Sequence, residues 1–310
     1  MDKVSIIIPM YNEEEVVKIC YNRVKNVLEA IKEYDYEIIC VDDGSVDNTL
    51  KLLEDISKTD SKVKIVSFSR NFGHQPAVSA GLKLSSGNAA IVIDADMQDP
   101  PELISDMLKL YKEGNSVVYA KRKSRKGESK FKIYTAKIFY RLINKMSDIN
   151  IPMDAGDFRL LSREVVDVIN SMPENNKYLR GLYSYAGFKQ IPIEYEREER
   201  QAGKTKYTLK KMVKLALNGI ISLSTKPLKI VGVLGFSSVI IALCLFIYAI
   251  ISYIVKQDNI LSGWTSIIIT IIFFGGVQLI SLWIMSEYIA RIYDETKRRP
   301  EYIIEKKINF

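Results

Sequence analysis

Two long stretches without a charged residue dominate the C-terminal third of the chain. The first runs from Ile230 to Val255 and the second from Asn259 to Ser286, about 26 and 28 residues. Each exceeds the roughly 20 residues that an α-helix needs to cross the hydrocarbon core of a bilayer. Neither has the polar face that a helix on a soluble domain presents to water. We therefore predict two transmembrane helices, joined by a short link as a hairpin.

Lysine and arginine gather at the two outer ends of this predicted hairpin. Lys226 and Lys229 precede it, and Arg291 and the run Lys297–Arg299 follow it. The positive-inside rule therefore places the N-terminal domain and the C-terminal tail in the cytoplasm. The whole chain carries only a mild excess, 44 Lys+Arg against 37 Asp+Glu. The local basic patches suit an anionic partner, either a phosphorylated substrate or a membrane surface. No recognised nucleic-acid-binding module accompanies them.

The first part of the chain alternates short apolar runs with helical patterns. Continuous apolar strands separated by helices are typical of a mostly parallel, doubly wound α/β sheet with both faces covered. The predicted strands are Val4–Ile8, Glu37–Val41, Lys64–Phe68, Ala89–Ile93 and Ser116–Ala120. The predicted helices are Glu13–Glu33, one from about Asn48, one near Gln75–Leu84 and one after Pro101.

Acidic residues follow two of these strands directly. Asp42-Asp43 comes after the second strand, and Asp94–Asp96 comes after the fourth. A single aspartate in such a place is often a turn residue or a helix N-cap. In open α/β sheets, however, ligands bind beyond the carboxyl ends of the strands. Two acidic clusters at two strand ends therefore favour a binding site.

Residues with nucleophilic or zinc-binding chemistry are scarce. The chain has one histidine, His74, so a His-rich zinc site is excluded and a Ser-His-Asp triad would depend on that residue alone. Cys20, Cys40 and Cys244 lie far apart in apolar surroundings. They show no metal-binding spacing and no disulfide framework, which indicates a reducing compartment.

Two further stretches combine apolar residues with lysine and arginine at helical spacing, Lys130–Met146 and Thr208–Leu223. A basic amphipathic helix next to a membrane span is suited to lie in the membrane interface. An ordinary surface helix packed on the domain is the alternative.

Several motifs resemble those of known enzymes. The runs Ile6–Glu13, Val41–Ser45 and Asp94–Asp96 resemble, in order and spacing, the signature of family 2 glycosyltransferases of GT-A fold. A second set is more specific and resembles the bactoprenol (undecaprenyl-phosphate) glucosyltransferases, relatives of dolichol-phosphate mannosyltransferases. The resemblance covers essentially the whole chain, including the hairpin. The second set consists of Arg70–Gln75, Asp94–Pro101 and Asp154–Leu160.

The resemblance implies a site for a nucleotide sugar and a divalent cation, Mg²⁺ or Mn²⁺. Such a cation prefers hard oxygen ligands and neutralises the diphosphate that leaves. By the family's pattern the metal ligands are Asp94, Asp96 and Gln98. The donor-binding residues that it implies are Pro9, Tyr11, Glu13, Asp42, Asp94 and Asp96.

The acceptor side requires positive charge. A polyprenyl phosphate has a second pKa of about 6, so its oxygen is already a competent nucleophile at neutral pH. The site must dock this phosphate in line with the anomeric carbon. Asp157 either acts as a base or orients a basic residue, and we favour orientation. The predicted phosphate ligands are Arg122, Arg125, Arg200 and Lys204, and the predicted catalytic residues are Asp96, Asp157 and Arg122.

The expected reaction is an inverting transfer of glucose from UDP-glucose to undecaprenyl phosphate at the cytoplasmic membrane, for modification of a cell-surface glycan. Another donor sugar, such as mannose, aminoarabinose or an N-acetylhexosamine, is the first alternative. A processive polysaccharide synthase is disfavoured, because Trp264 and Trp283 lie in the hairpin and no Gln-x-x-Arg-Trp-type motif occurs. A non-catalytic membrane scaffold would not need the acidic set.

The predicted organisation has four parts. A catalytic domain spans 1–191, a basic connection with an interfacial helix spans 192–227, the transmembrane hairpin spans 228–290, and a cytoplasmic tail spans 291–310. Gly275-Gly276 would allow close helix packing, so a homo-oligomer is compatible with the sequence.

Overall fold

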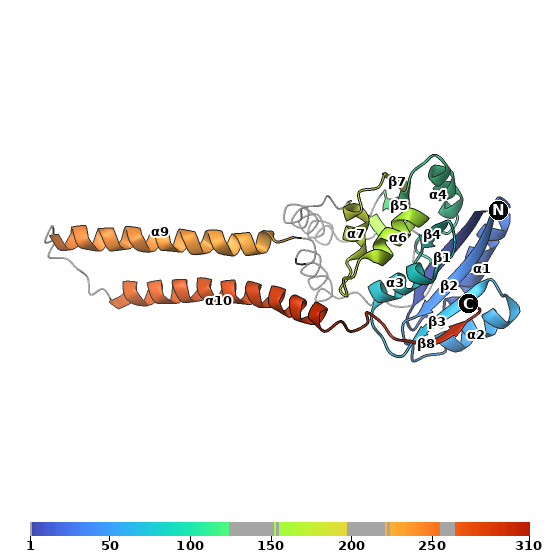
Figure 1. Cartoon of the computed structure of the whole chain (residues 1–310), viewed down its shortest axis with the longest axis horizontal. Helices are drawn as coiled ribbons and strands as arrows, with labels where there is room; N and C mark the ends of the chain where they lie inside the picture. Colours follow the sequence, from blue (N-terminus) through green and yellow to red (C-terminus); the bar gives the residue numbers. More distant parts are fainter. Residues whose placement is uncertain (1, 124–151, 153–154, 197–220, 222–223, 255–263) are drawn as a thin grey trace.

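The computed structural model describes residues 2–123, 152, 155–196, 221, 224–254 and 264–310. An α/β domain forms one end of the molecule, and two long helices extend from it side by side (Figure 1). Both basic amphipathic stretches lie outside the described residues, apart from Ile221. The same holds for Arg125, Arg200 and Lys204.

The domain is built on an eight-stranded sheet in the order β7-β5-β6-β4-β1-β2-β3-β8. Strands β4, β1, β2 and β3 run parallel, as do β5 and β7. Two strands are antiparallel to their neighbours: β6, inserted between β4 and β5, and β8, at the β3 edge. The predicted, mostly parallel sheet is confirmed. The strands are β1 (Asp2–Met10), β2 (Tyr34–Asp42), β3 (Val63–Phe68), β4 (Ala89–Val92), β5 (Val117–Arg122), β6 (Ala155–Ser162), β7 (Gln190–Tyr195) and β8 (Ile304–Ile308).

Helices cover both faces of the sheet, because consecutive residues of a strand point to opposite sides. In β1, Ile6 and Ile8 pack into the core beneath α1, α2 and α4. Ile7 packs on the other face, with α3, α6 and α7. These helices are α1 (Val17–Ala30), α2 (Thr49–Thr59), α3 (His74–Leu84), α4 (Leu103–Lys112), α6 (Arg163–Ser171) and α7 (Leu179–Tyr185).

The first helix is shorter than the predicted Glu13–Glu33, since α1 begins at Val17 and ends at Ala30. At its start, side chains of the neighbouring loop bind the backbone. The Glu13 N–H donates to Thr49 Oγ1 at 2.8 Å, and Asn12 adopts a left-handed φ of 54°. Residues 11–16 therefore belong to the loop after β1 rather than to the helix.

The C-terminal tail returns to the domain and adds strand β8 to the exposed edge of β3. The Ser69 N–H donates to the Ile303 carbonyl at 3.1 Å, and the rings of Phe68 and Tyr302 stack at 5.0 Å. The Asn309 amide donates to the carbonyl of Val63 at 2.8 Å. Such pairing protects an edge strand from other chains. The sheet thus extends past the predicted Ile191 boundary through β7 and includes part of the predicted tail.

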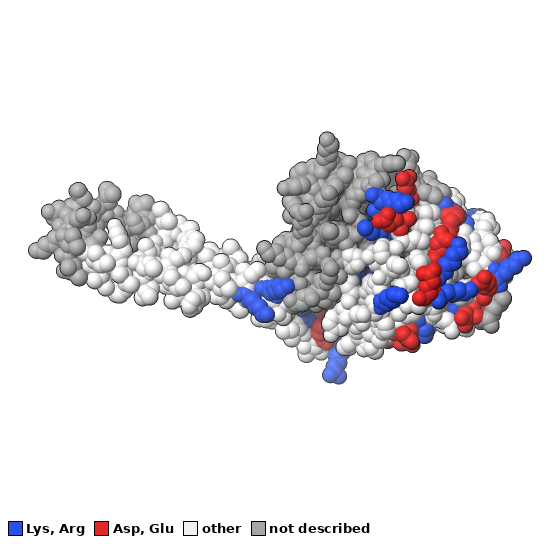
Figure 2. All heavy atoms as spheres, turned by 90° about the horizontal axis from the view of Figure 1, so that it is seen from above, with Lys and Arg blue, Asp and Glu red and all other residues white. Residues whose placement is uncertain are grey.

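The two predicted hairpin helices are confirmed as α9 (Lys226–Ile254) and α10 (Trp264–Thr296). Both are long and apolar enough to cross a membrane. Their large apolar side chains face outward, as Phe236 (70% exposed) and Leu279 (69%) illustrate. Charged side chains cover the α/β domain, whereas the described part of the hairpin carries them only near the domain (Figure 2). Exposed apolar surface of this extent indicates association with a membrane.

Candidate functional site

The loops that follow β1 and β2 are joined to each other by hydrogen bonds. The Asn12 N–H donates to Ser45 Oγ at 2.9 Å, and the Val46 N–H donates to Asn12 Oδ1 at 2.9 Å. This arrangement places Tyr11, 36% exposed, and Glu13 at the carboxyl end of the sheet. Pro9 is buried within β1. Tyr11 and Glu13 thus lie in the loop beyond the carboxyl end of β1.

The two aspartates at the end of β2 serve the fold in different ways. Asp42 is 1% exposed, and its carboxylate accepts hydrogen bonds from Ser67 Oγ at 3.0 Å and from the Ser45 N–H at 3.2 Å. Asp43 accepts the N–H groups of Phe72 at 2.6 Å and Gly73 at 2.9 Å. Burial raises the pKa of Asp43, although these two N–H groups oppose the shift. Asp43 therefore holds the loop that precedes α3.

Gly44 allows this loop to approach closely. Its φ is +67°, and a Cβ atom there would lie 2.4 Å from the backbone carbonyl carbon of Arg70. Only glycine meets both conditions without strain. The Asp-Asp-Gly sequence thus positions the Arg70–Gln75 motif.

The first residue of α3, His74, faces the acidic residues after β4. Its Nε2 lies 3.0 Å from Asp94 Oδ1. His74, Asp94 and Asp157 each offer a metal-ligand atom, and these atoms lie within 4.8 Å of one another. Burial would lower the pKa of His74, but Asp94 and then Asp157 outweigh it and raise that pKa to about 9. The imidazole is therefore expected to be a cation at neutral pH in the metal-free protein.

Asp157 forms a bidentate ion pair with Arg180 at the start of α7. The Arg180 Nε and Nη2 atoms lie 2.7 and 2.6 Å from its two carboxylate oxygens. Burial alone would raise the pKa of Asp157, but Arg180 holds it well below the usual range. Asp157 therefore remains ionised. A permanently ionised carboxylate paired with arginine is suited to orientation and poorly suited to taking up a proton.

The topology explains why Asp94 and Asp157 meet. Strand β6 pairs antiparallel with β4, with Val92 opposite Arg159. The beginning of β6 therefore lies beside the end of β4. In the loop after β4, Asp96 accepts the Gln98 N–H at 3.2 Å, and Met97 has a left-handed φ of 54°. Asp94 and Asp96 are both partly exposed in this loop.

Arg122, at the end of β5, belongs to a second polar group. Its Nε donates to the Tyr195 hydroxyl at 3.3 Å, and that hydroxyl donates to Asp99, which is 1% exposed. Burial would lower the pKa of Arg122, but the Asp99 carboxylate raises it. A Cβ atom on Gly156 would lie 3.7 Å from Arg122 Nη2. Arg122 thus lies next to the strand that carries Asp157.

Sequence reasoning missed several residues of this site. His74 and Gln75 lie within the motif Arg70–Gln75, whose residue types alone predict no role for either of them, and Arg180 has no local signal in the sequence. Its partner lies 23 positions away in the sequence and on another element. Asp43 follows the predicted residue Asp42, and Asp99 follows the predicted residue Gln98. Their hydrogen-bond partners, the Phe72 N–H and the Tyr195 hydroxyl, are evident only in the folded structure.

Comparison with known proteins identifies the family. Residues 5–169, more than half of the chain, match the profile of glycosyl transferase family 2. The uncharacterized glycosyltransferase YkcC of Bacillus subtilis (strain 168) is 49% identical, over 97% of this chain and 93% of that protein. The prophage bactoprenol glucosyl transferase homolog of Escherichia coli (strain K12) is 42% identical, over 98% and 99%. The bactoprenol glucosyl transferase of Shigella phage SfII is 41% identical, over 98% of each chain.

Among solved structures, glucosyl-3-phosphoglycerate synthase from Mycobacterium tuberculosis, in complex with Mn²⁺, UDP-glucose and phosphoglyceric acid, is similar over 71% of this chain and 78% of that chain. The sequence identity is 18% and the TM-score is 0.46. The family profile and the near full-length relatives decide the assignment. The chain belongs to glycosyltransferase family 2, and its α/β domain is a GT-A glycosyltransferase domain.

Proposed function

We propose that the protein transfers glucose from UDP-glucose to undecaprenyl phosphate, with inversion at the anomeric carbon. One observation carries this proposal: relatives named bactoprenol glucosyl transferase match 98% of the chain at 41–42% identity. The match therefore includes the apolar hairpin, which a water-soluble acceptor would not require. Transfer of another sugar to the same lipid is the second candidate.

The donor half of the site is proposed at the ends of β1 and β4. Asp94, Asp96 and Gln98 supply carboxylate and amide oxygens, a donor set that fits Mg²⁺ or Mn²⁺. A cation held there would offset the charge of the leaving diphosphate. Tyr11 and Glu13 are proposed to line the base and ribose pocket, with Pro9 and Asp42 behind them. Asp42 is buried and already hydrogen-bonded to Ser67, whereas Tyr11 is partly exposed. Contact with the base is therefore better supported for Tyr11 than for Asp42.

The acceptor half is proposed at the end of β5 and the beginning of β6, around Arg122 and Asp157, with Arg125, Arg200 and Lys204 as further phosphate ligands. The lipid phosphate needs no base, because it is largely a dianion above a pKa of about 6. One of its oxygens attacks the anomeric carbon while the bond from that carbon to the diphosphate breaks, and the electron pair leaves with UDP. No proton is transferred. The proposed role of Asp157 is therefore orientation.

The pairing of β8 with β3 bears on how the hairpin is placed in the membrane. Strand β8 follows the hairpin and pairs with β3 in the same sheet as β1. This pairing supports the proposal that both outer ends of the hairpin lie on the same side of the membrane and that its two helices each cross it once. We propose that this side is the cytoplasm, because Lys226, Lys229 and Arg291 flank the apolar helices there.

A transfer assay on the purified full-length protein tests the proposal. Undecaprenyl phosphate, Mg²⁺ or Mn²⁺ and a panel of radiolabelled UDP- and GDP-sugars would be supplied, and the lipid would be extracted. Label from UDP-glucose that disappears with EDTA is the expected result. Label from another nucleotide sugar would change the proposed donor and leave the proposed lipid acceptor unchanged. An α-linked product by NMR would refute inversion, and no lipid label from any donor would refute the proposal.

A further inference from the structure

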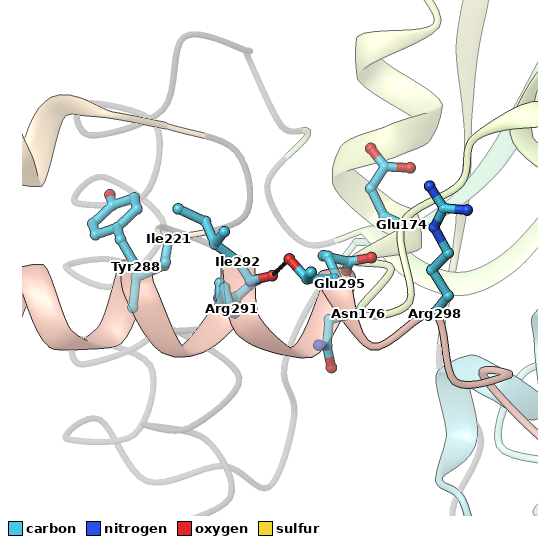
Figure 3. A pocket seen from close by; sticks show the side chains of 9 residues that line it. Glu174, Asn176, Ile221, Tyr288, Arg291, Ile292, Glu295 and Arg298 are labelled. Carbon is cyan, nitrogen blue, oxygen red and sulfur yellow. Dashed lines mark hydrogen bonds between the residues drawn. The ribbon is translucent and has the colours of Figure 1, made fainter.

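The end of membrane helix α10 that lies nearest the domain is bound to a loop of that domain. The Glu295 carboxylate accepts the Asn175 backbone N–H, with distances of 2.9 and 3.2 Å to its two oxygens. Beside this contact lies a hollow of about 750 Å³ between α10 and the loop, lined by Glu174, Asn176 and Tyr288 among others (Figure 3). Among the residues that the structure describes, the contact between this end of α10 and the loop on that side is therefore made by the hydrogen bonds to Glu295.

The same loop leads directly into the site. Four residues after Asn175, the Leu179 N–H donates to Gln75 Oε1 at 3.1 Å. The next residue is Arg180, which binds Asp157 through two hydrogen bonds. Leu179 is 1% exposed and Tyr178 is 4% exposed, so this stretch is anchored in the domain. Only residues 176–178 separate Asn175 from Leu179, so the position of Asn175 constrains where α7 begins.

The segment that follows α10 also lies against the domain. Glu301, between α10 and β8, is half-buried near Lys177, Lys83 and Ser79. Its burial raises its pKa to about 7, and the two lysines oppose the shift. Lys83 and Ser79 belong to α3, the helix that begins with His74. The segment that follows α10 thus lies near Lys83 of α3, the helix that begins with His74, and near Lys177, which precedes α7.

We propose that Glu295 is a positioning residue, which fixes Arg180 and hence Asp157 according to where the membrane helix lies. The catalytic part of this inference rests on the proposed function, because it assumes that Asp157 serves the lipid acceptor. Glu295 itself touches neither substrate. Its effect passes through the Asn175 backbone and the first turn of α7.

The test compares Glu295→Ala and Glu295→Gln with Asp294→Asn. Asp294 is the neighbouring carboxylate; it is exposed, and in the described part of the chain it lies 3.5 Å from Lys297 Nζ, three residues along. Hydrogen exchange would be followed by mass spectrometry on peptides covering residues 173–183. Glu295→Ala should speed exchange at Asn175 to Arg180 by about tenfold, since a hydrogen bond to a carboxylate is lost. Glu295→Gln keeps an acceptor oxygen and should restore most of the protection, and Asp294→Asn should change nothing.

Activity provides the second readout. Glu295→Ala should lower kcat for lipid transfer by about five- to tenfold and leave KM for the nucleotide sugar within about twofold. Unchanged exchange at residues 175–180 would overturn the proposal, whatever the activity. Faster exchange with an unchanged kcat would also overturn the positioning role. If the wild-type protein transferred no sugar, the proposed function would fail, while the exchange data would still decide whether Glu295 holds the α7 region.

Discussion

The chain's single histidine allows a direct test of the electrostatics of the site. His74 lies 3.0 Å from Asp94 and close to Asp157, and these carboxylates raise its pKa to about 9 against the effect of burial. Replacing Asp94 by Asn removes the nearer charge while keeping the shape. We expect the His74 pKa to fall in Asp94→Asn toward the value of about 6.5 of an unperturbed histidine.

One contact opposes the charged form of His74. The Gln75 side-chain oxygen accepts the Leu179 N–H, so its NH₂ group faces His74 Nδ1, at 3.5 Å. An NH₂ donor favours an unprotonated Nδ1. At 3.5 Å this hydrogen bond is at its geometric limit, whereas the 3.0 Å contact with Asp94 joins opposite charges. The carboxylates are therefore expected to prevail.

The raised pKa of His74 also implies that its protonation contributes to the free energy of unfolding. A shift from about 6.5 to about 9 would correspond to roughly 3 kcal/mol for a fully buried pair. The His74 side chain is 41% exposed, and solvent screening reduces this to about 1 kcal/mol. Because the folded-state pKa is raised, this stability is fully present below pH 6.5 and is lost as the pH rises through about 9.

The assay is an NMR titration of the ¹³C-labelled imidazole in EDTA, where only one histidine contributes signals. Asp106→Asn is the matched control, because Asp106 is exposed and pairs with Lys109 on α4. It should leave the His74 pKa unchanged. A wild-type pKa at or below 6.5 would refute the reasoning, since burial and Gln75 would then outweigh both carboxylates.

Three other substitutions test separate parts of the structure. Asp96→Ala should reduce turnover at least about 100-fold by removing a proposed cation ligand, as measured by lipid labelling; near-normal turnover would exclude Asp96 from the site. Arg122→Ala should raise KM for the lipid and leave donor affinity by calorimetry nearly intact, and a loss of donor affinity would contradict the proposed division of the site. Gly44→Ala should destabilise the fold by about 2 kcal/mol or more in denaturant unfolding, because its Cβ would clash with the Arg70 backbone; unchanged stability would contradict that clash.

Local patterns in the sequence were sufficient for much of the fold. The apolar runs of β1 to β4 and the helical periods between them were predicted within a few residues. Both uncharged stretches were also predicted to be helices, although α10 continues past the predicted Ser286 to Thr296. These features depend on side-chain alternation and run length, which neighbouring residues determine. The motif Asp94–Asp96 was found for the same reason, since a strand end and its acidic residues are adjacent in the chain.

Only the tertiary structure decided which distant segments meet. Strand β6 enters antiparallel between β4 and β5 and brings Asp157 beside Asp94, and β8 returns from beyond the hairpin to pair with β3. Arg180 acquires a role only because α7 packs beside the start of β6. Pairing between remote strands and ion pairs between remote side chains leave no periodic signal in the chain. They form because the assembled core places these groups within hydrogen-bonding distance. The sequence alone therefore determined β1 to β5, the helices between them and the two apolar helices, whereas β6, β7, β8, α6 and α7 and the meeting of the candidate site residues depended on the tertiary structure.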